Sequence, residues 1–223
     1  MNQTPVTEIF NSNIYALVPD SVAKILEVGT GSGSLAAAIK KKIPFVEYVG
    51  VEISSEYANL SRAHCDKVYL DNFEKPNYKL IQEISNADCI IFSDVLEHFV
   101  DPWSVLEMLR LTMKPSACII ASIPNIQHWS IQLRLNGGDW SYSENGLLDK
   151  THLRFFTRQT ICALFEKTGF IITHIEPRIF NFPNQIQALD IIAKITSLLS
   201  GNEEASRLDA SAFQYVITAQ PKS

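Results

Sequence analysis

The chain of 223 residues is 46% hydrophobic and 19% charged, and it carries a net charge of -5 with a pI near 5.5. This composition is typical of one globular domain that buries a core, and it argues against a disordered chain. The acidic balance argues against a nucleic-acid-binding protein, because such proteins neutralise phosphates with clustered Lys and Arg.

The cysteines and the N-terminus indicate the compartment. The cysteines are far apart and form neither a CxxC pair nor a Cys/His cluster at metal-ligand spacing: Cys65, Cys89, Cys118 and Cys162. We therefore expect reduced thiols and no metal site. The first ten residues lack the basic and apolar segments of a signal peptide, and the longest apolar run, 117–121, is too short to span a bilayer. We expect a cytoplasmic protein without a transmembrane segment.

Short runs rich in Val and Ile alternate with helical patterns along the chain, which is typical of βαβ units. The runs are nearly continuous in hydrophobicity, as in central strands that helices cover on both faces. The pattern predicts an α/β fold with a doubly wound sheet. Its expected strands are 24–28, 47–52, 67–70, 88–92, 117–123, 170–176 and 213–219.

Helical spacing with recognisable ends predicts helices over 32–42, 54–64, 101–113 and 157–168. Asp101 and Thr157 are placed to cap the last two helices, and Pro102 suits a first helical turn. Gly169 can take the left-handed conformation that closes a helix.

Two stretches do not fit this alternation. Residues 124–156 hold Gly137-Gly138, two tryptophans and two histidines but few helical signals, so we expect an irregular insertion there. Residues 183–210 hold an amphipathic segment, which we expect to form a helical cap. Its apolar side covers the core, pairs with a second copy in a homodimer or rests on a membrane, and we favour the first interpretation. That side carries Ile186, Leu189, Ile192, Ala193, Ile195 and Leu199.

The most informative segment is KILEVGTGSGSLA at residues 24–36, where a predicted strand leads into a predicted helix through Gly29, Gly31 and Gly33. Glycines permit a sharp turn and the close approach of a ligand, while a helix N-terminus offers unpaired N–H groups. In a doubly wound sheet this turn lies at the ligand crevice. The segment therefore predicts a site for a nucleotide-like ligand.

A second element points to a nucleoside. The next predicted strand ends in Glu52, whose carboxylate can accept hydrogen bonds from both hydroxyls of a ribose. A dinucleotide site needs the spacing GxGxxG, but Ser34 stands three residues after Gly31. A nucleotide-dependent oxidoreductase is therefore the less favoured alternative.

The spacing ExGxGxG, which starts at Glu27, resembles the first motif of class I S-adenosylmethionine-dependent methyltransferases. In that family, Glu52 matches the ribose-binding acid, and Asp71-Asn72 match the position that binds the adenine amino group. The resemblance implies that the cofactor S-adenosylmethionine contacts Glu27, Gly29, Gly31, Gly33, Glu52, Ile53, Asp71, Asn72, Ser93 and Asp94.

The resemblance covers most of the chain. The segment SDVLEHFVDP at 93–102 is similar to the family's fourth-strand motif, which lies under the methionine part of the cofactor. MKPSACIIASIPN at 113–125 is similar to its turn and fifth strand, although Ser116-Ala117 replace a glycine pair that is common there. The family's fold implies a Rossmann-like, seven-stranded mixed sheet with helices on both faces, in which 213–219 form the antiparallel last strand.

The segment DKTHLRFFT at 149–157 resembles a subfamily of small methyltransferases that accompany glycan and lipid-linked sugar biosynthesis. The acceptor expected from this resemblance is a small molecule or a glycan-type compound. Because open α/β sheets bind ligands beyond the carboxyl ends of their strands, we expect the insertion 124–156 to form the acceptor side of the site.

Methyl transfer from a sulfonium is an in-line displacement that depends on alignment, and a base helps when the acceptor is a hydroxyl. We expect His128 or His152 to be that base, and His98 and Asp94 are further candidates. Each histidine has an alternative structural role, in packing or in anchoring a loop. We therefore predict a methyltransferase that favours O-methylation, with a catalytically silent cofactor-binding protein as the alternative.

Overall fold

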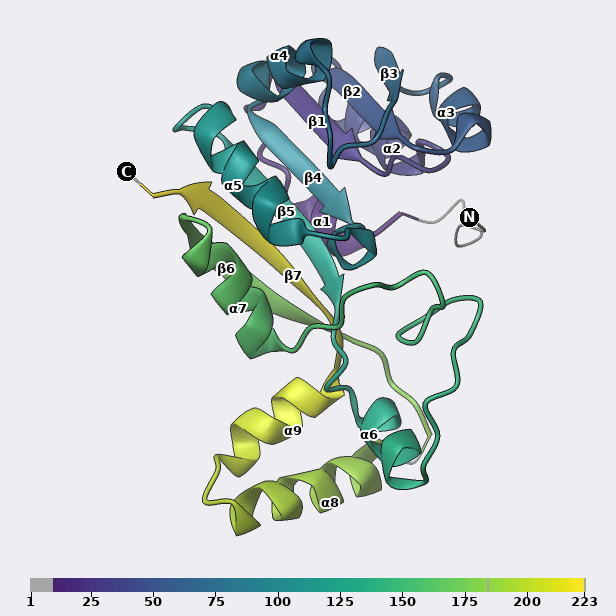
Figure 1. The fold of residues 1–223 in the computed structure, drawn as a ribbon, viewed down its shortest axis with the longest axis vertical. Coiled ribbons are helices and arrows are strands. Elements are labelled where there is room, and N and C mark those ends of the chain that lie inside the picture. The colour runs from purple at the N-terminus through teal and green to yellow at the C-terminus, as the bar shows by residue number, and fades with distance from the viewer. Residues whose placement is uncertain (1–9, 184, 223) are drawn as a thin grey trace.

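A computed structural model describes residues 10–183 and 185–222, and within them seven strands form one mixed sheet (Figure 1). The strand order is β3-β2-β1-β4-β5-β7-β6. The strands are β1 (Lys24–Val28), β2 (Glu47–Glu52), β3 (Lys67–Leu70), β4 (Cys89–Ser93), β5 (Cys118–Pro124), β6 (Phe170–Ile179) and β7 (Ala212–Pro221).

The first five strands pair in parallel, and β7 is antiparallel to both β5 and β6. The predicted seven-stranded mixed sheet and its antiparallel last strand are therefore confirmed. The predicted strands agree closely with the observed ones, because the apolar runs coincide with stretches that are buried on both faces in every strand except the edge strands β3 and β6.

The helices are α1 (Ser12–Leu17), α2 (Ser34–Lys42), α3 (Ser55–Ser61), α4 (Tyr78–Asn86), α5 (Pro102–Thr112), α6 (Trp129–Asn136), α7 (Arg158–Lys167), α8 (Gln185–Leu198) and α9 (Glu203–Ser211), with a short 3-10 turn, η1, at Leu96–His98. The four helices predicted before residue 170 are confirmed, and Asp101 and Thr157 cap α5 and α7 as expected. The sequence analysis missed α1, α4 and α6, whose lengths of 6, 9 and 8 residues leave little room for a periodic pattern.

Two hydrophobic clusters lie on opposite faces of the sheet. Leu26 and Phe92 belong to the cluster under α4, α5 and α7, whereas Ile25 and Ile91 belong to the cluster under α1 and α2. Neighbouring residues of one strand thus enter different clusters, as the alternation of side chains across a sheet requires. Figure 1 views the sheet from the side of α5 and α7.

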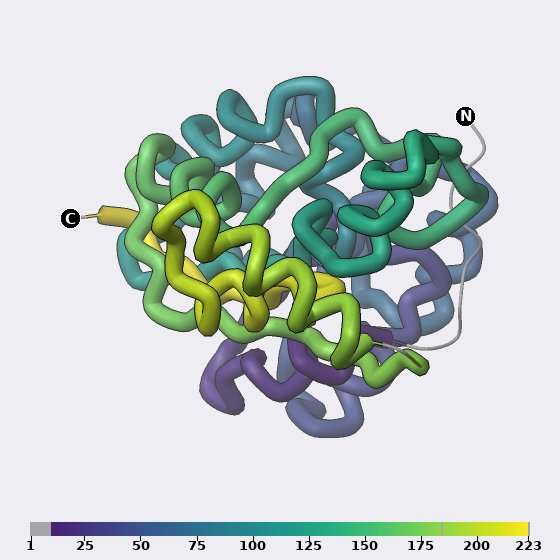
Figure 2. Tube along the Cα trace, turned by 90° about the horizontal axis from the view of Figure 1, so that it is seen from below, coloured from purple at the N-terminus to yellow at the C-terminus, as the bar shows by residue number. Residues whose placement is uncertain are grey.

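The last helices form a lobe apart from these clusters. In Figures 1 and 2, α8 and α9 lie side by side beyond the end of the sheet, close to α6. Leu189, Ile192 and Ala210 form a small cluster of their own against Trp129. The expectation that segment 183–210 covers the main core is therefore wrong, because the buried apolar residues of α8 and α9 pack on each other and on Trp129, outside the two clusters on the sheet.

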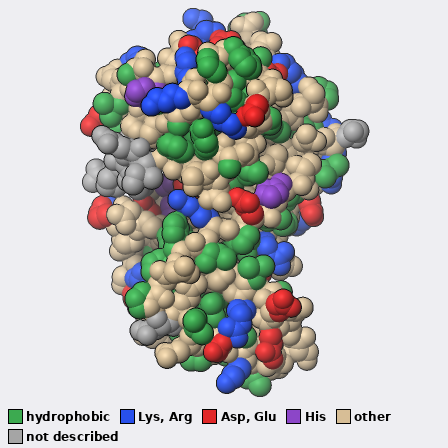
Figure 3. All heavy atoms as spheres, turned by 180° about the vertical axis from the view of Figure 1, so that it is seen from behind, with side chains coloured by type: hydrophobic (Ala, Val, Ile, Leu, Met, Phe, Trp, Pro, Cys, Tyr) green, Lys and Arg blue, Asp and Glu red, His purple; other side chains and the backbone are tan. Residues whose placement is uncertain are grey.

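The rest of the apolar side of α8 is exposed, including Ile186 and Ile195. Figure 3 shows acidic and basic side chains beside hydrophobic ones in this part of the surface. No helix in the described part of the chain is long and apolar enough to cross a membrane.

Hydrogen bonds fasten the lobe to the sheet. Asp209, at the end of α9, accepts hydrogen bonds from the Tyr215 hydroxyl at 2.6 Å and from Arg158 Nε at 2.7 Å. The buried Asn125 amide donates to the carbonyl oxygens of Asp209 at 2.7 Å and Ala212 at 2.8 Å. These bonds join the residue after β5 to the start of β7, so the insertion 124–156 starts from a fixed point.

Candidate functional site

The loop between β1 and α2 has the geometry that its glycines predict. Gly29, Gly31 and Gly33 have φ angles of 73°, 52° and 79°, in the left-handed region that favours glycine. A Cβ atom at Gly29 would lie 2.6 Å from Val95 Cγ2, so the loop after β4 packs directly on this turn. A Cβ atom at Gly31 would have no other atom within 4 Å, so Gly31 faces open space.

Glu52 and this loop are brought together, as the sequence predicted. Glu52 is buried at the end of β2, and its Oε2 accepts a hydrogen bond from the Gly31 N–H at 3.1 Å. Its Oε1 accepts from the N–H groups of Ile53 at 2.8 Å and Ser54 at 3.0 Å. A carboxylate has about four acceptor positions, so one remains for a ligand. Among the described residues, no side chain forms a capping hydrogen bond with the N-terminus of α2.

Glu27 lies in the buried part of β1 and accepts a hydrogen bond from the Tyr48 hydroxyl at 2.9 Å. Burial raises the pKa of Glu27 to about 8, since the charged form would lose its hydration. The negative charge of Glu52 adds to the rise. At neutral pH the Glu27 carboxyl is therefore protonated, and Tyr48 is its protein partner.

Asp71 and Asn72 follow β3 in a turn held by their own side chains. Asp71 Oδ2 accepts a hydrogen bond from Asn77 Nδ2 at 2.6 Å, and Asn72 Oδ1 accepts one from the Glu74 N–H at 2.9 Å. Asn72 lines a surface cavity of about 350 Å³ whose other wall is the start of α5. The adenine contact expected for these two residues stays a prediction.

Asp94 follows Ser93 at the end of β4 and has a φ of 56°, a left-handed conformation that is rare for a residue with a side chain. Its Oδ1 accepts hydrogen bonds from Ser122 Oγ at 3.0 Å and from Gln214 Nε2 at 2.6 Å. Burial raises the pKa of Asp94 to about 6, although these hydrogen bonds and the nearby Arg178 lower it. Strain of this kind is found at functional sites, where the surrounding structure holds it in place.

A second cavity, of about 210 Å³, opens at the carboxyl ends of β4 and β5. We call it the β4–β5 pocket. Residues from the end of β4, the insertion 124–156 and the start of β7 line it: Asp94, Glu97, Pro124, Gly146, Asp149, His152, Phe213 and Gln214. Two consecutive residues connect the pocket with the glycine loop. Asp94 lines the pocket, and the next residue, Val95, packs on Gly29.

The two histidines expected to act as a base have different positions. His152 lines the β4–β5 pocket, with Nδ1 3.4 Å from the Leu147 carbonyl oxygen and Nε2 3.9 Å from Glu97 Oε1. His128 is the N-cap of α6, with Nδ1 2.8 Å from Ser130 Oγ, and it does not line this pocket. Burial lowers the pKa of both imidazoles to about 4, so both are neutral at neutral pH.

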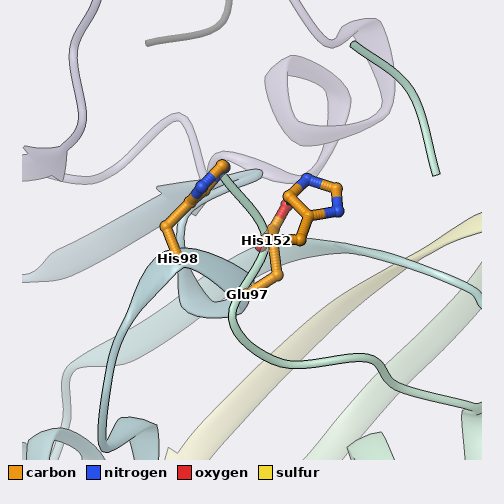
Figure 4. A group of neighbouring side chains, drawn as sticks. All are labelled: Glu97, His98 and His152. Atoms are coloured by element: carbon orange, nitrogen blue, oxygen red, sulfur yellow. The ribbon is translucent and has the colours of Figure 1, made fainter. Parts of the chain in front are cut away.

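Sequence reasoning did not select Glu97, which also lines the pocket. Its carboxyl is only 1% exposed, and neither oxygen has a hydrogen-bond partner among the described residues. Burial raises the pKa of Glu97 well above its usual range. Figure 4 shows Glu97 between His98, from η1, and His152, from the insertion. The signal was present in SDVLEHFVDP, but that motif does not reveal which side chain from elsewhere faces Glu97.

Comparisons with known proteins agree with this geometry. A family described as "Methyltransferase domain" matches residues 8–175. A ubiquinone biosynthesis O-methyltransferase of Acinetobacter baylyi is 25% identical over 121 residues, covering 52% of this chain and 50% of the relative. The enzyme of the same name from Hydrogenovibrio crunogenus is 24% identical over 155 residues, covering 66% and 62%. The chain thus spans less than two thirds of the length of these relatives.

Among solved structures, an S-adenosylmethionine-dependent methyltransferase of Thermotoga maritima has the same fold, with a TM-score of 0.64 at 18% identity. The match covers 95% of this chain and 86% of that one. The two relatives above carry names from ubiquinone biosynthesis, so they do not support the expected association with glycans.

The protonated Glu27 predicts a pH dependence of stability. The unfolded carboxyl loses its proton near pH 4.5, whereas the folded one keeps it up to about pH 8. Its contribution to stability is therefore complete below about pH 4.5 and is lost progressively as the pH rises from there to about 8. Glu27→Gln keeps an acceptor for Tyr48 and cannot ionise, so its stability relative to the wild type should rise by a few kcal/mol, on the order of 3, between about pH 4.5 and about pH 8.

Thermal unfolding of both proteins at about pH 4.5 and about pH 8 measures this difference. Glu56→Gln, on the exposed first turn of α3, is the matched control and should follow the wild type at both values. Parallel curves for Glu27→Gln and the wild type would show that Glu27 is ionised in the folded state.

Proposed function

The chain belongs to the methyltransferase domain family, whose cofactor is S-adenosylmethionine, and on this basis we propose that it methylates a hydroxyl group of a small-molecule acceptor. The observation that carries the proposal is the β4–β5 pocket, which is lined by the partly buried carboxylate of Asp94. The residue after Asp94, Val95, contacts the glycine loop. A donor site and an acceptor site that meet at one strand end suit a reaction that depends on alignment.

The residues of the glycine loop fit the cofactor. Gly31 leaves space for a ligand, Glu52 keeps an acceptor position for a ribose hydroxyl, and the N-terminus of α2 is uncapped. We propose that these groups hold S-adenosylmethionine, with Gly29, Gly33, Ile53, Asp71, Asn72 and Ser93 around it. The bound cofactor supplies a methyl group activated by a sulfonium. In this proposal Glu27, which is hydrogen-bonded to Tyr48, stabilises the end of β1 that leads into the loop and does not contact the cofactor.

We propose that Asp94 is the base that takes the proton of the acceptor's hydroxyl group. Both hydrogen bonds that its carboxylate receives from the described residues fall on Oδ1, so Oδ2 is available to take a proton. A pKa of about 6 is well matched to a base that works near neutral pH. In His152, by contrast, one ring nitrogen faces the Leu147 carbonyl and the other faces Glu97. In this proposal Asp94 acts on the acceptor, whereas the resemblance implied that it contacts the cofactor.

The size and lining of the pocket favour a ring as the acceptor. A cavity of roughly 150 Å³ admits a benzene molecule, so about 210 Å³ accommodates one substituted ring. Phe213 and Pro124 offer apolar contacts, while Asp94 and Gln214 offer hydrogen bonds. The O-methyltransferases similar to this chain are named for ubiquinone biosynthesis, a pathway to a quinone ring. We therefore propose a hydroxylated aromatic ring, in place of a glycan.

Glu52→Ala tests the cofactor site. Loss of the carboxylate should weaken S-adenosylmethionine binding by about 1 to 3 kcal/mol, a roughly 5- to 150-fold rise in Kd. Titration calorimetry measures the affinity, and thermal unfolding checks that the variant folds. Glu56→Ala, which removes an exposed carboxylate four residues away, should bind like the wild type. An unchanged Kd for Glu52→Ala would mean that the cofactor binds elsewhere.

Asp94→Asn tests the base. Asparagine can still accept from Ser122 and Gln214, but it cannot take the acceptor's proton, so turnover should fall by a factor of about 10² to 10⁴. A panel of hydroxylated aromatic compounds with S-adenosylmethionine provides the assay, and donor affinity should change less than about threefold.

His128→Ala is the comparison, because His128 lies outside the β4–β5 pocket and should leave turnover within a few fold. If Asp94→Asn retains the turnover of the wild type, Asp94 is not the base. If the wild type binds S-adenosylmethionine but methylates no compound of the panel, the O-methylation of aromatic rings is wrong, and a catalytically silent binding protein becomes the better description.

A further inference from the structure

We propose that Glu97, His98 and His152 form a binding site for a divalent transition-metal ion beside the β4–β5 pocket, which Glu97 and His152 line. One donor atom from each of the three side chains lies within 4.8 Å of the others, and His152 Nε2 is 3.9 Å from Glu97 Oε1. Figure 4 shows the two imidazoles on either side of the Glu97 carboxyl. The spacing in the sequence predicted no metal site, because His152 comes from a distant segment.

Backbone carbonyls orient both imidazoles. Nδ1 of His98 lies 3.2 Å from both the carbonyl oxygen and the hydroxyl of Thr151, and that hydroxyl donates its hydrogen to Asp149 Oδ1 at 2.7 Å. Nδ1 of His152 lies 3.4 Å from the Leu147 carbonyl oxygen. A carbonyl oxygen can only accept, so each Nδ1 carries the hydrogen and each Nε2 carries a lone pair. Histidine ligands of metals are commonly held in this way, by a hydrogen bond from the nitrogen that does not bind the metal.

Glu97 supplies an independent argument. Its side chain is 1% exposed, and both oxygens lack hydrogen-bond partners among the described residues. A buried polar group without a partner costs free energy, and buried carboxylates are usually paired with a cation or a metal. Asp94 and Asp149 line the same pocket and add negative charge, and the structure places no Lys or Arg among the residues that line it. The pocket thus favours a cation beside Glu97.

The donor set indicates the class of metal. Two neutral imidazole nitrogens and one carboxylate oxygen suit zinc and other first-row divalent ions, whereas magnesium and calcium prefer oxygen ligands. Donors around a tetrahedral zinc ion at about 2.0 to 2.2 Å lie roughly 3.3 to 3.6 Å apart. The most widely separated donors, which lie up to 4.8 Å apart, therefore need to approach each other by about 1.2 to 1.5 Å, which side-chain rotation can supply.

The site has a place in the proposed methyl transfer, and this part rests on that proposed function. Glu97 and His152 share the pocket with Asp94, so an open coordination position would face the acceptor. A hydroxyl oxygen bound to the ion becomes more acidic. Its proton then passes to Asp94 Oδ2: the O–H bond of the acceptor breaks and an O–H bond on the carboxyl forms. His152 holds the ion in this scheme, while Asp94 acts as the base.

The test begins with binding, without acceptor or S-adenosylmethionine. The protein is stripped of metal with a chelator, and Zn²⁺ and Co²⁺ are titrated by calorimetry and by the visible absorption of Co²⁺. We expect one ion per chain. Glu97→Gln and His152→Asn should each weaken binding by about 10- to 100-fold or more. His174→Asn, which changes an exposed histidine on β6, should bind the ion like the wild type.

Circular dichroism of each variant checks that it folds, and Glu97→Asp keeps a carboxylate, so it should retain more affinity than Glu97→Gln. The metal site is wrong if the wild type binds neither ion, or if Glu97→Gln and His152→Asn bind it unchanged. Because these titrations need no turnover, they stand apart from the methylation assay. If the metal binds and a chelator leaves methylation unchanged, the role in acceptor activation is wrong.

Discussion

The position of β4 between β1 and β5 is the constraint on which the candidate site depends. Parallel pairing aligns Phe92 with Val28 on one side and Ser93 with Ser122 on the other, so the three strands end at one edge of the sheet. Asp94 then turns into the left-handed region, where the Ser122 hydroxyl and the Gln214 amide hold its carboxylate. The next residue, Val95, packs on the glycine loop. One turn thus connects the donor side of the site to the acceptor side.

The buried carboxyl groups around this edge are satisfied in different ways, and the difference bears on their roles. Glu52 receives three backbone N–H groups, Glu27 receives a tyrosine hydroxyl, and Asp94 receives a hydroxyl and an amide. Glu97 receives no hydrogen bond from the described residues. Because an unpaired buried polar group costs free energy, a bound ligand would stabilise Glu97 more than the other three carboxyl groups.

The acceptor side is built from segments that lie outside the alternating strands and helices. The insertion 124–156 starts from Asn125, whose amide binds the end of α9 and the start of β7, and returns to bring His152 to the pocket. The glycine loop, in contrast, belongs to the first strand–helix unit of the sheet. A common donor site and a variable acceptor wall can therefore coexist, since changes in the insertion need not alter the sheet.

The sequence by itself determined the strands, the turn at the glycines and the caps at Asp101 and Thr157, because these features depend on local hydrophobicity and on backbone conformation. The pairing of Glu52 with the loop was also predictable, since consecutive parallel strands end side by side. Only the tertiary structure separated His152, at the β4–β5 pocket, from His128, at a helix cap. It alone brought Glu97 to His152, because contacts between distant segments arise from the path of an irregular insertion, which no periodic pattern encodes.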